Sequence, residues 1–106
     1  MAEQISASHI LLMYAGSERS RATRSKDEAR SKITGIAQDL EAGGDFAALA
    51  KAHSDCGSAQ AGGDLGSFGR GQMVRAFEEA AFALNVGDTS GVVETPFGFH
   101  IIRRTG

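Results

Sequence analysis

The chain has 106 residues, of which 42% are hydrophobic and 23% are charged, and its net charge is −2. This length suits one domain with a core of its own, so we expect residues 1–106 to form a single domain and a monomer. The charge balance gives no general attraction to nucleic acid or to an anionic membrane, and no apolar run is long enough to cross a bilayer. We therefore expect neither as a partner.

The N-terminus and the cysteine content favour a cytoplasmic protein. Residues 1–5 have neither the basic start nor the apolar stretch of a signal peptide. Cys56 is the only cysteine, so the chain cannot form an internal disulfide. We therefore expect a reducing, cytoplasmic environment.

The chain begins with a predicted strand and a charged loop. Residues 5–13 alternate in a way that predicts a strand partly buried on both faces, with His9 on an apolar face. Residues 14–24 have no apolar period and are predicted to form an exposed loop. Basic side chains crowd this loop and the residues after it: Arg19, Arg21, Arg24, Lys26, Arg30 and Lys32. A solvated surface is the simpler interpretation, and a patch that attracts acidic or phosphorylated partners is the alternative.

Two helices are predicted after the loop. Ser25 and Glu28 have the spacing of a capping box, and apolar side chains then recur at helical intervals until Gly43. Asp45 is predicted to cap a second, shorter helix whose apolar face includes Phe46.

The remaining elements lie in the second half of the chain. We predict a short strand at 64–68, a helix from Phe77 to Leu84, and a hairpin of strands at 92–95 and 99–105. Strands at both ends of the chain with helices between them indicate an α+β domain in which the first and last strands pair centrally.

Residues 53–73 are rich in glycine, which suggests a phosphate-binding loop. A P-loop needs a Lys-Ser or Lys-Thr pair at a helix start, and a dinucleotide-binding loop needs a tight strand-loop-helix unit. Neither is present, so we interpret these glycines as turns.

Cys56, with Asp55 beside it, is a candidate nucleophile if a histidine lies near it in the fold. No protease signature surrounds it, and a single cysteine is usually a small structural thiol. The residues alone leave both interpretations open.

A metal site is not expected, because His9, His53 and His100 lack close spacing and only one thiol is available. His9 and His100 nevertheless lie in two strands that we expect to be neighbours. In that arrangement each imidazole can fix the tautomer and the orientation of the other.

Five ordered motifs resemble the parvulin peptidyl-prolyl cis/trans isomerases. They are Ser8-His9-Ile10-Leu11, Ser54-Asp55-Cys56 with the following Gly63 to Phe68, Arg70-Gly71-Gln72-Met73, Phe77 to Leu84, and Phe97 to Ile102. The Ser-Asp-Cys and Arg-Gly-Gln-Met segments are most similar to the branch that isomerises phosphoserine-proline and phosphothreonine-proline bonds. Unlike members of that branch with an accessory WW module, this chain contains none.

The resemblance implies a parvulin fold, in which about four helices surround a four-stranded antiparallel sheet. It implies an enzyme that needs no cofactor and isomerises X-Pro bonds in peptides and in unfolded or partly folded proteins. It also implies a pocket for the proline ring formed by Leu65, Met73 and Phe77, with Phe68 and Gln72 at its border. Without the resemblance, the apolar residues would be assigned to the core.

The same resemblance places His9 and His100 as a pair behind the active site, with Cys56 and Thr95 as polar partners and Asp55 beside the thiol. We expect these five residues to be the catalytic group and to act through a hydrogen-bonded network. Rotation about an amide breaks no σ bond, so this chemistry does not need a covalent nucleophile.

Substrate preference is where the sequence departs from the phosphate-directed branch. That branch has a basic residue at the end of the first strand, whereas this strand ends in Met13 and Tyr14 and is followed by a shorter loop. Arg19 and Arg21 remain in the loop, and we expect them to favour an acidic or phosphorylated residue before proline. The alternative from another functional class is a non-catalytic peptide-binding or chaperone domain on the same scaffold.

Overall fold

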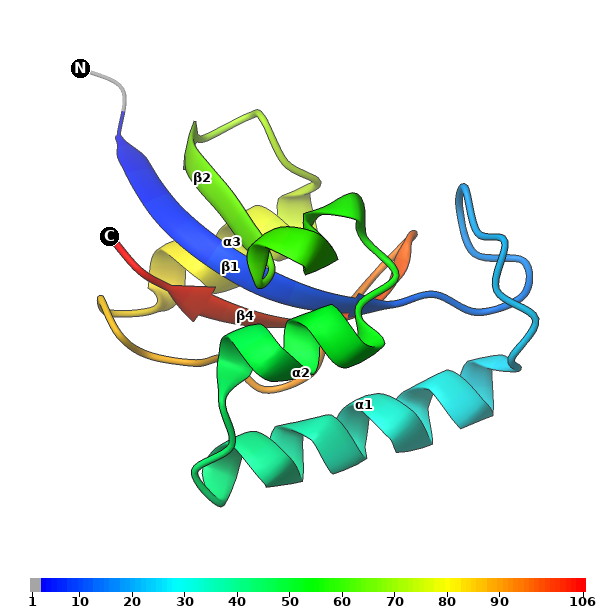
Figure 1. The fold of residues 1–106 in the computed structure, drawn as a ribbon. Coiled ribbons are helices and arrows are strands. Elements are labelled where there is room, and N and C mark those ends of the chain that lie inside the picture. Colours follow the sequence, from blue (N-terminus) through cyan, green and yellow to red (C-terminus); the bar gives the residue numbers. More distant parts are fainter. Residues whose placement is uncertain (1–2) are drawn as a thin grey trace.

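The computed structural model describes residues 3–106, which form one antiparallel sheet with helices on both of its faces (Figure 1). In chain order the elements are β1 (Gln4–Leu12), α1 (Lys26–Glu41), α2 (Phe46–His53), the short 3-10 helix η1 (Gly57–Ala61), β2 (Asp64–Gly69), α3 (Arg75–Ala83), β3 (Val93–Thr95) and β4 (Gly98–Arg104). The strand order is β2-β1-β4-β3. The expected α+β architecture is therefore confirmed, with the first and last strands paired at its centre.

Side chains along the central strands β1 and β4 point alternately to the two faces of the sheet, which divides the core into two layers. Ile10 and Ile101 belong to the layer that α1 and α2 cover, whereas Ile5 and Ile102 belong to the layer that α3 covers. His9 pairs with Ile102 across the two strands, so its side chain lies on the α3 side of the sheet. This register puts His9 and His100 on the same face, one diagonal step apart.

The helix starts follow the predicted capping chemistry. Ser25 Oγ accepts a hydrogen bond from the Glu28 N–H (3.1 Å), and the Ser25 N–H donates to Glu28 Oε1 (2.9 Å). Asp45 caps α2 by accepting a hydrogen bond from the Ala48 N–H (3.2 Å). Both caps satisfy amides that have no partner within their own helix.

The boundaries of several elements differ from the prediction. The first strand begins and ends one residue early, at Gln4–Leu12. α3 spans Arg75–Ala83 and so begins before Phe77, where the prediction placed its start. The sequence does not mark this start, because no side chain caps the first turn. The 3-10 helix η1 was not predicted, since five residues of this composition carry no helical period.

Gly98 joins the β3–β4 hairpin tightly to the end of β1. Its φ is +146°, and a Cβ placed there would overlap the carbonyl of Leu12 and touch the backbone of Met13. Only glycine allows this approach without strain. The hairpin turn is thereby held against the strand that carries His9.

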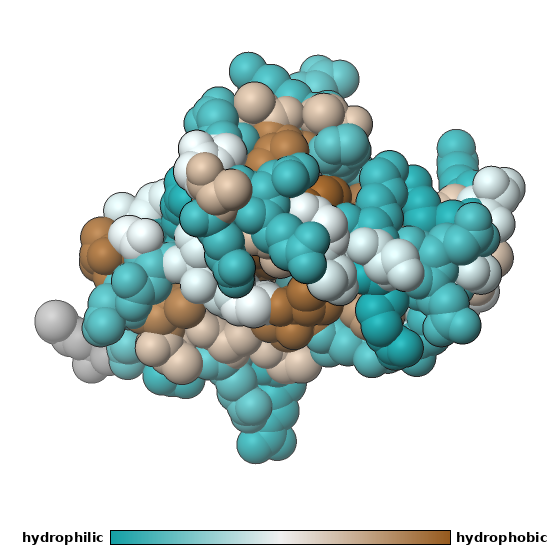
Figure 2. Space-filling view, turned by 90° about the horizontal axis from the view of Figure 1, so that it is seen from below, coloured by the Kyte–Doolittle hydropathy of each residue, from teal (hydrophilic) through white to brown (hydrophobic). Residues whose placement is uncertain are grey.

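The surface on the side of α1 is mostly hydrophilic, with apolar residues in separate small areas (Figure 2). No helix within residues 3–106 is long and apolar enough to cross a membrane.

Candidate active site

A pocket of about 460 Å³ lies where β1, β2, β4, α3 and the loop after α2 meet. Most of the predicted site residues line it: His9, Arg19, Asp55, Cys56, Leu65, Gln72, Met73, Phe77 and His100. Thr95, Phe68 and Arg21 do not line it. The structure thus brings together residues that are up to 91 positions apart in the chain.

Five further residues line the pocket: Leu11, Met13, Gly57, Val74 and Phe97, of which Phe97 opens the last of the five motifs in the family resemblance. Leu11 and Met13 continue the two-residue alternation that starts at His9, so strand periodicity could have found them. Phe97 follows no such alternation, because its position depends on the hairpin turn, and only the family resemblance indicated it.

One side of the pocket is apolar. Leu65, Met73 and Phe77 line it, and Phe77 is buried with its ring edge-on to both histidines, at centroid distances of 5.5 Å from His9 and 5.3 Å from His100. Phe68 lies behind this wall, 2% exposed and 6.0 Å from the ring centroid of Phe77. It therefore supports the wall from the core and is not at the border of the pocket.

Gln72 also lines the pocket, but part of its side chain is already engaged. Its Oε1 accepts a hydrogen bond from the Gly69 N–H (2.8 Å). The amide NH₂ is the part that remains for another partner.

The two histidines form the centre of a buried polar chain. His9 Nδ1 lies 3.1 Å from His100 Nδ1, and His100 Nε2 lies 2.7 Å from Thr95 Oγ1. Thr95 Oγ1 in turn accepts a hydrogen bond from the Phe97 N–H (3.2 Å). Because a hydrogen bond between two Nδ1 atoms needs one donor and one acceptor, the pair is stable only while at least one ring is neutral. Burial, assisted by the charge that His9 can carry, lowers the pKa of His100 to about 3.

Cys56 reaches the pocket because the loop after α2 is hydrogen-bonded to Leu11, near the end of β1. The Leu11 N–H donates to Ser54 Oγ (3.0 Å), and the Asp55 N–H donates to the Leu11 carbonyl (2.7 Å). The thiol is thereby placed beside the imidazole of His9.

The pKa of Cys56 falls to about 6, chiefly through the interaction of its thiol with His9 and in part through Ser58. His9 Nε2 is buried and has no partner with full hydrogen-bond geometry among the described residues, so its contact with the sulfur is close but not an ideal hydrogen bond. An imidazole that faces a sulfur in this way favours the thiolate at neutral pH.

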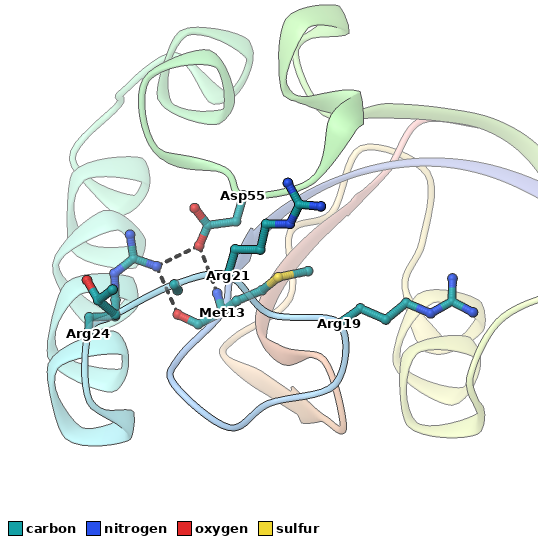
Figure 3. Close-up of a pocket in the computed structure, with 7 residues that line it drawn as sticks. Met13, Arg19, Arg21, Arg24 and Asp55 are labelled. Atoms are coloured by element: carbon teal, nitrogen blue, oxygen red, sulfur yellow. Dashed lines mark hydrogen bonds and ion pairs between the residues drawn. The ribbon is translucent and has the colours of Figure 1, made fainter.

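The Asp55 carboxylate is bound by Arg24, at the end of the charged loop, and by the residue after β1. Its Oδ2 accepts hydrogen bonds from Arg24 Nη1 (2.6 Å) and from the Met13 N–H (2.9 Å), and Arg24 Nη1 also donates to the Met13 carbonyl (2.8 Å). Figure 3 shows these contacts at the end of β1. The carboxylate therefore ties the start of the charged loop to the loop that carries Cys56.

Arg19 and Arg21 lie in a second pocket of about 440 Å³, which shares Met13, Arg19 and Asp55 with the first. Neither arginine has an ion pair within residues 3–106, and their side chains extend in different directions (Figure 3). Arg19 has a φ of 59°, the only positive value among the described residues other than glycine. Such strain is found where the surrounding structure holds a residue in place.

Within residues 3–106, no three His, Cys, Asp or Glu side chains converge in a way that could hold a metal ion. Two of the pocket's polar side chains, His9 and His100, instead bond to each other.

A sequence profile of the PPIC-type PPIASE domain matches residues 1–106. The chain belongs to the parvulin family of peptidyl-prolyl cis/trans isomerases. The parvulin named peptidyl-prolyl cis-trans isomerase Pin1 of Digitalis lanata is 45% identical, over 98% of this chain and 98% of the relative. Its namesake in Arabidopsis thaliana is also 45% identical, over 97% and 96%. The predicted family, fold and enzyme class, a rotamase, are thus confirmed.

The fold agrees with solved parvulin structures. Peptidyl-prolyl isomerase ESS1 from Candida albicans superimposes with a TM-score of 0.92 at 38% identity, over 97% of this chain and 63% of that one.

Proposed function

We propose that this parvulin isomerises X-Pro bonds without a covalent intermediate, and that it prefers an acidic or phosphorylated residue before the proline. The main support is that a single pocket combines an apolar wall with a buried polar chain that ends in a low-pKa thiol. The length of the chain supports a single domain, and the free cysteine supports a reducing, cytoplasmic setting. There the protein would act as a monomer on proline-containing peptides and partly folded proteins.

The barrier to be lowered is electronic. Amide resonance holds an X-Pro bond planar with a barrier of about 18–20 kcal/mol. In the twisted state the resonance is lost, so the carbonyl oxygen gives up partial negative charge and the prolyl nitrogen becomes more basic. An acceleration of about 10⁵ requires the site to favour the twisted state by about 7 kcal/mol.

Leu65, Met73 and Phe77 would hold the pyrrolidine ring. An apolar wall of this kind excludes water and fixes one side of the bond while the other rotates. Because the ring carries no polar group, its recognition needs burial alone.

Cys56 would act on the carbonyl side. A thiol with a pKa of about 6 is mostly thiolate at neutral pH. A negative charge that faces the carbonyl oxygen raises the energy of the planar amide more than that of the twisted amide, whose oxygen is less negative. His9, His100 and Thr95 would keep that charge oriented through their hydrogen bonds.

Arg19 would recognise the side chain of the residue before proline. It lines both the proline pocket and the adjoining pocket that Arg21 shares, and neither arginine is neutralised by a carboxylate within residues 3–106. Arg24, by contrast, is committed to Asp55. A guanidinium suits either a carboxylate or a phosphate.

The test compares Glu-Pro, phosphoSer-Pro and Ala-Pro peptides by NMR exchange spectroscopy, which needs no coupling protease. We expect faster exchange for the two acidic peptides, an advantage that shrinks at high salt. Arg19→Ala should lower kcat/KM for them about threefold to fivefold and leave Ala-Pro unchanged. Lys51→Ala, which removes an exposed positive charge from α2, is the matched control and should change nothing.

Equal turnover of the three peptides would refute the charge preference. Peptide binding without any exchange would instead favour a non-catalytic binding or chaperone domain.

A further inference from the structure

The turn between β2 and α3 carries part of the pocket rim. Gln72 and Met73 line the pocket from this turn, and Gly71 within it has a φ of +88°. The turn lies outside the helices and strands, so its position depends on the hydrogen bonds that tie it to its neighbours.

One carboxylate outside the pocket holds this turn. Glu78 Oε1, in the first turn of α3, accepts a hydrogen bond from the Gly71 N–H. Its Oε2 lies 3.9 Å from Arg70 Nη1, and the Glu78 side chain is 15% exposed. A carboxylate at this place in a helix is also favoured by the helix dipole.

Arg70 is fastened in turn by its other contacts. Its guanidinium lies 4.3 Å from the ring centroid of Phe82 and 3.8 Å from Glu3 Oε2. The arginine therefore supports Glu78 from outside the pocket.

Glu78 follows Phe77 directly in α3, and Phe77 is the buried wall of the proline pocket. The same carboxylate thus joins the helix that supplies Phe77 to the turn that supplies Met73. We propose that Glu78 is a positioning residue that sets the separation of Phe77 and Met73, and with it the fit of the proline ring. This proposal rests on the proposed function.

The geometry makes reach, and not charge, the important property of Glu78. A glutamine has the same length and keeps an oxygen that can accept from the Gly71 N–H. An aspartate keeps the charge but is one methylene shorter, so it withdraws the oxygens from Gly71. An alanine removes both properties.

The adjacent Glu79 offers a matched control. It has the same charge on the same helix, but it bonds to Arg75 (2.8 Å), and both side chains are exposed. Exposed pairs of this kind contribute little.

The experiment measures kcat and KM for one Glu-Pro peptide with Glu78→Ala, Glu78→Gln, Glu78→Asp and Glu79→Ala. We expect KM to rise about tenfold in the alanine and aspartate variants with kcat changed less than about twofold, because the hydrogen bond that holds the turn is lost and lies outside the reacting atoms. Glu78→Gln and Glu79→Ala should stay within about threefold of the parent. If Glu78→Ala does not fold, the glutamine and aspartate variants still show whether the length or the charge of the side chain sets KM.

The amide proton of Gly71 gives a second readout by NMR. It should move upfield in the aspartate variant and much less in the glutamine variant. An aspartate variant that equals the parent while glutamine equals alanine would show an effect of charge and overturn the proposal. If the parent is active and the Glu78 variants keep its KM, the positioning role of Glu78 is refuted and the proposed function stands. If the parent itself is inactive, the proposed function is refuted.

Discussion

His9 Nδ1 and His100 Nδ1 lie 3.1 Å apart in the interior of the molecule, so each ring decides which tautomer the other adopts. His100 Nε2 is bound to Thr95 Oγ1, and the far side of His9 faces Cys56. If both rings carried a charge, neither Nδ1 could accept, and the hydrogen bond between them would be lost. The pair therefore links the stability of the fold to the charge state of the pocket.

Stability should fall in acid because of His100. Its pKa is about 3 in the folded chain and 6.5 for an ordinary histidine, so the unfolded chain takes up a proton below pH 6.5 that the folded chain does not. By linkage this group lowers the free energy of unfolding by about 3 kcal/mol between pH 6.5 and pH 4. Urea unfolding across this range measures the slope, and ring ¹⁵N shifts measure the titration. A His100 that titrates near its ordinary pKa would contradict this account.

Cys56 should be alkylated by iodoacetamide with a midpoint near pH 6, because the thiolate is the reactive form and His9 lowers its pKa. As the only cysteine, it can be followed by mass spectrometry without interference. A midpoint near the ordinary thiol pKa would show that the imidazole does not act on the sulfur.

The matched experiment is His9→Leu, which removes the main cause of the shift. The midpoint should move upward toward 9.0, the ordinary value for the thiol. If the low pKa instead survives in His9→Leu, Ser58 would be its main source.

Most of the fold could be predicted because its signals are local. The capping box at Ser25 and the alternation through His9 each fall within a few residues, and both were correct. η1 and the start of α3 were missed because neither has a side-chain cap.

The site was harder to predict, because contacts between side chains far apart in the chain have no local signal. Family resemblance indicated Leu65 and Phe77, but it could not show that Asp55 turns toward Arg24, 31 residues away. Nor could it show that Phe68 lies behind the pocket wall. Such orientations depend on the loop paths after β1 and α2.

Substitution of Cys56 should separate an electrostatic role from a covalent one. Cys56→Asp keeps a negative charge and should retain most of the activity, whereas Cys56→Ser lacks the charge and should lose about tenfold in kcat/KM. Cys56→Ala should lose at least as much. If Cys56 attacked the carbonyl to form a tetrahedral adduct, activity would instead be lost in all three variants, Cys56→Asp included. A thioester visible by mass spectrometry, formed with release of the prolyl amine, would show a hydrolase.

Gly98 should tolerate no side chain. In Gly98→Ala, the Cβ would overlap the carbonyl of Leu12 at a φ of +146°, so the hairpin would have to shift away from β1. We expect the variant to lose more than about 2 kcal/mol of stability and to lose activity as well, since Thr95 and His100 lie in this hairpin. Gly35→Ala is the matched control, because it lies inside α1 with nothing within 4 Å of the added Cβ. That variant should gain about 0.5–1 kcal/mol from helix propensity. Thermal unfolding of both variants measures the contrast, and equal melting temperatures would show that the hairpin is free to move from β1.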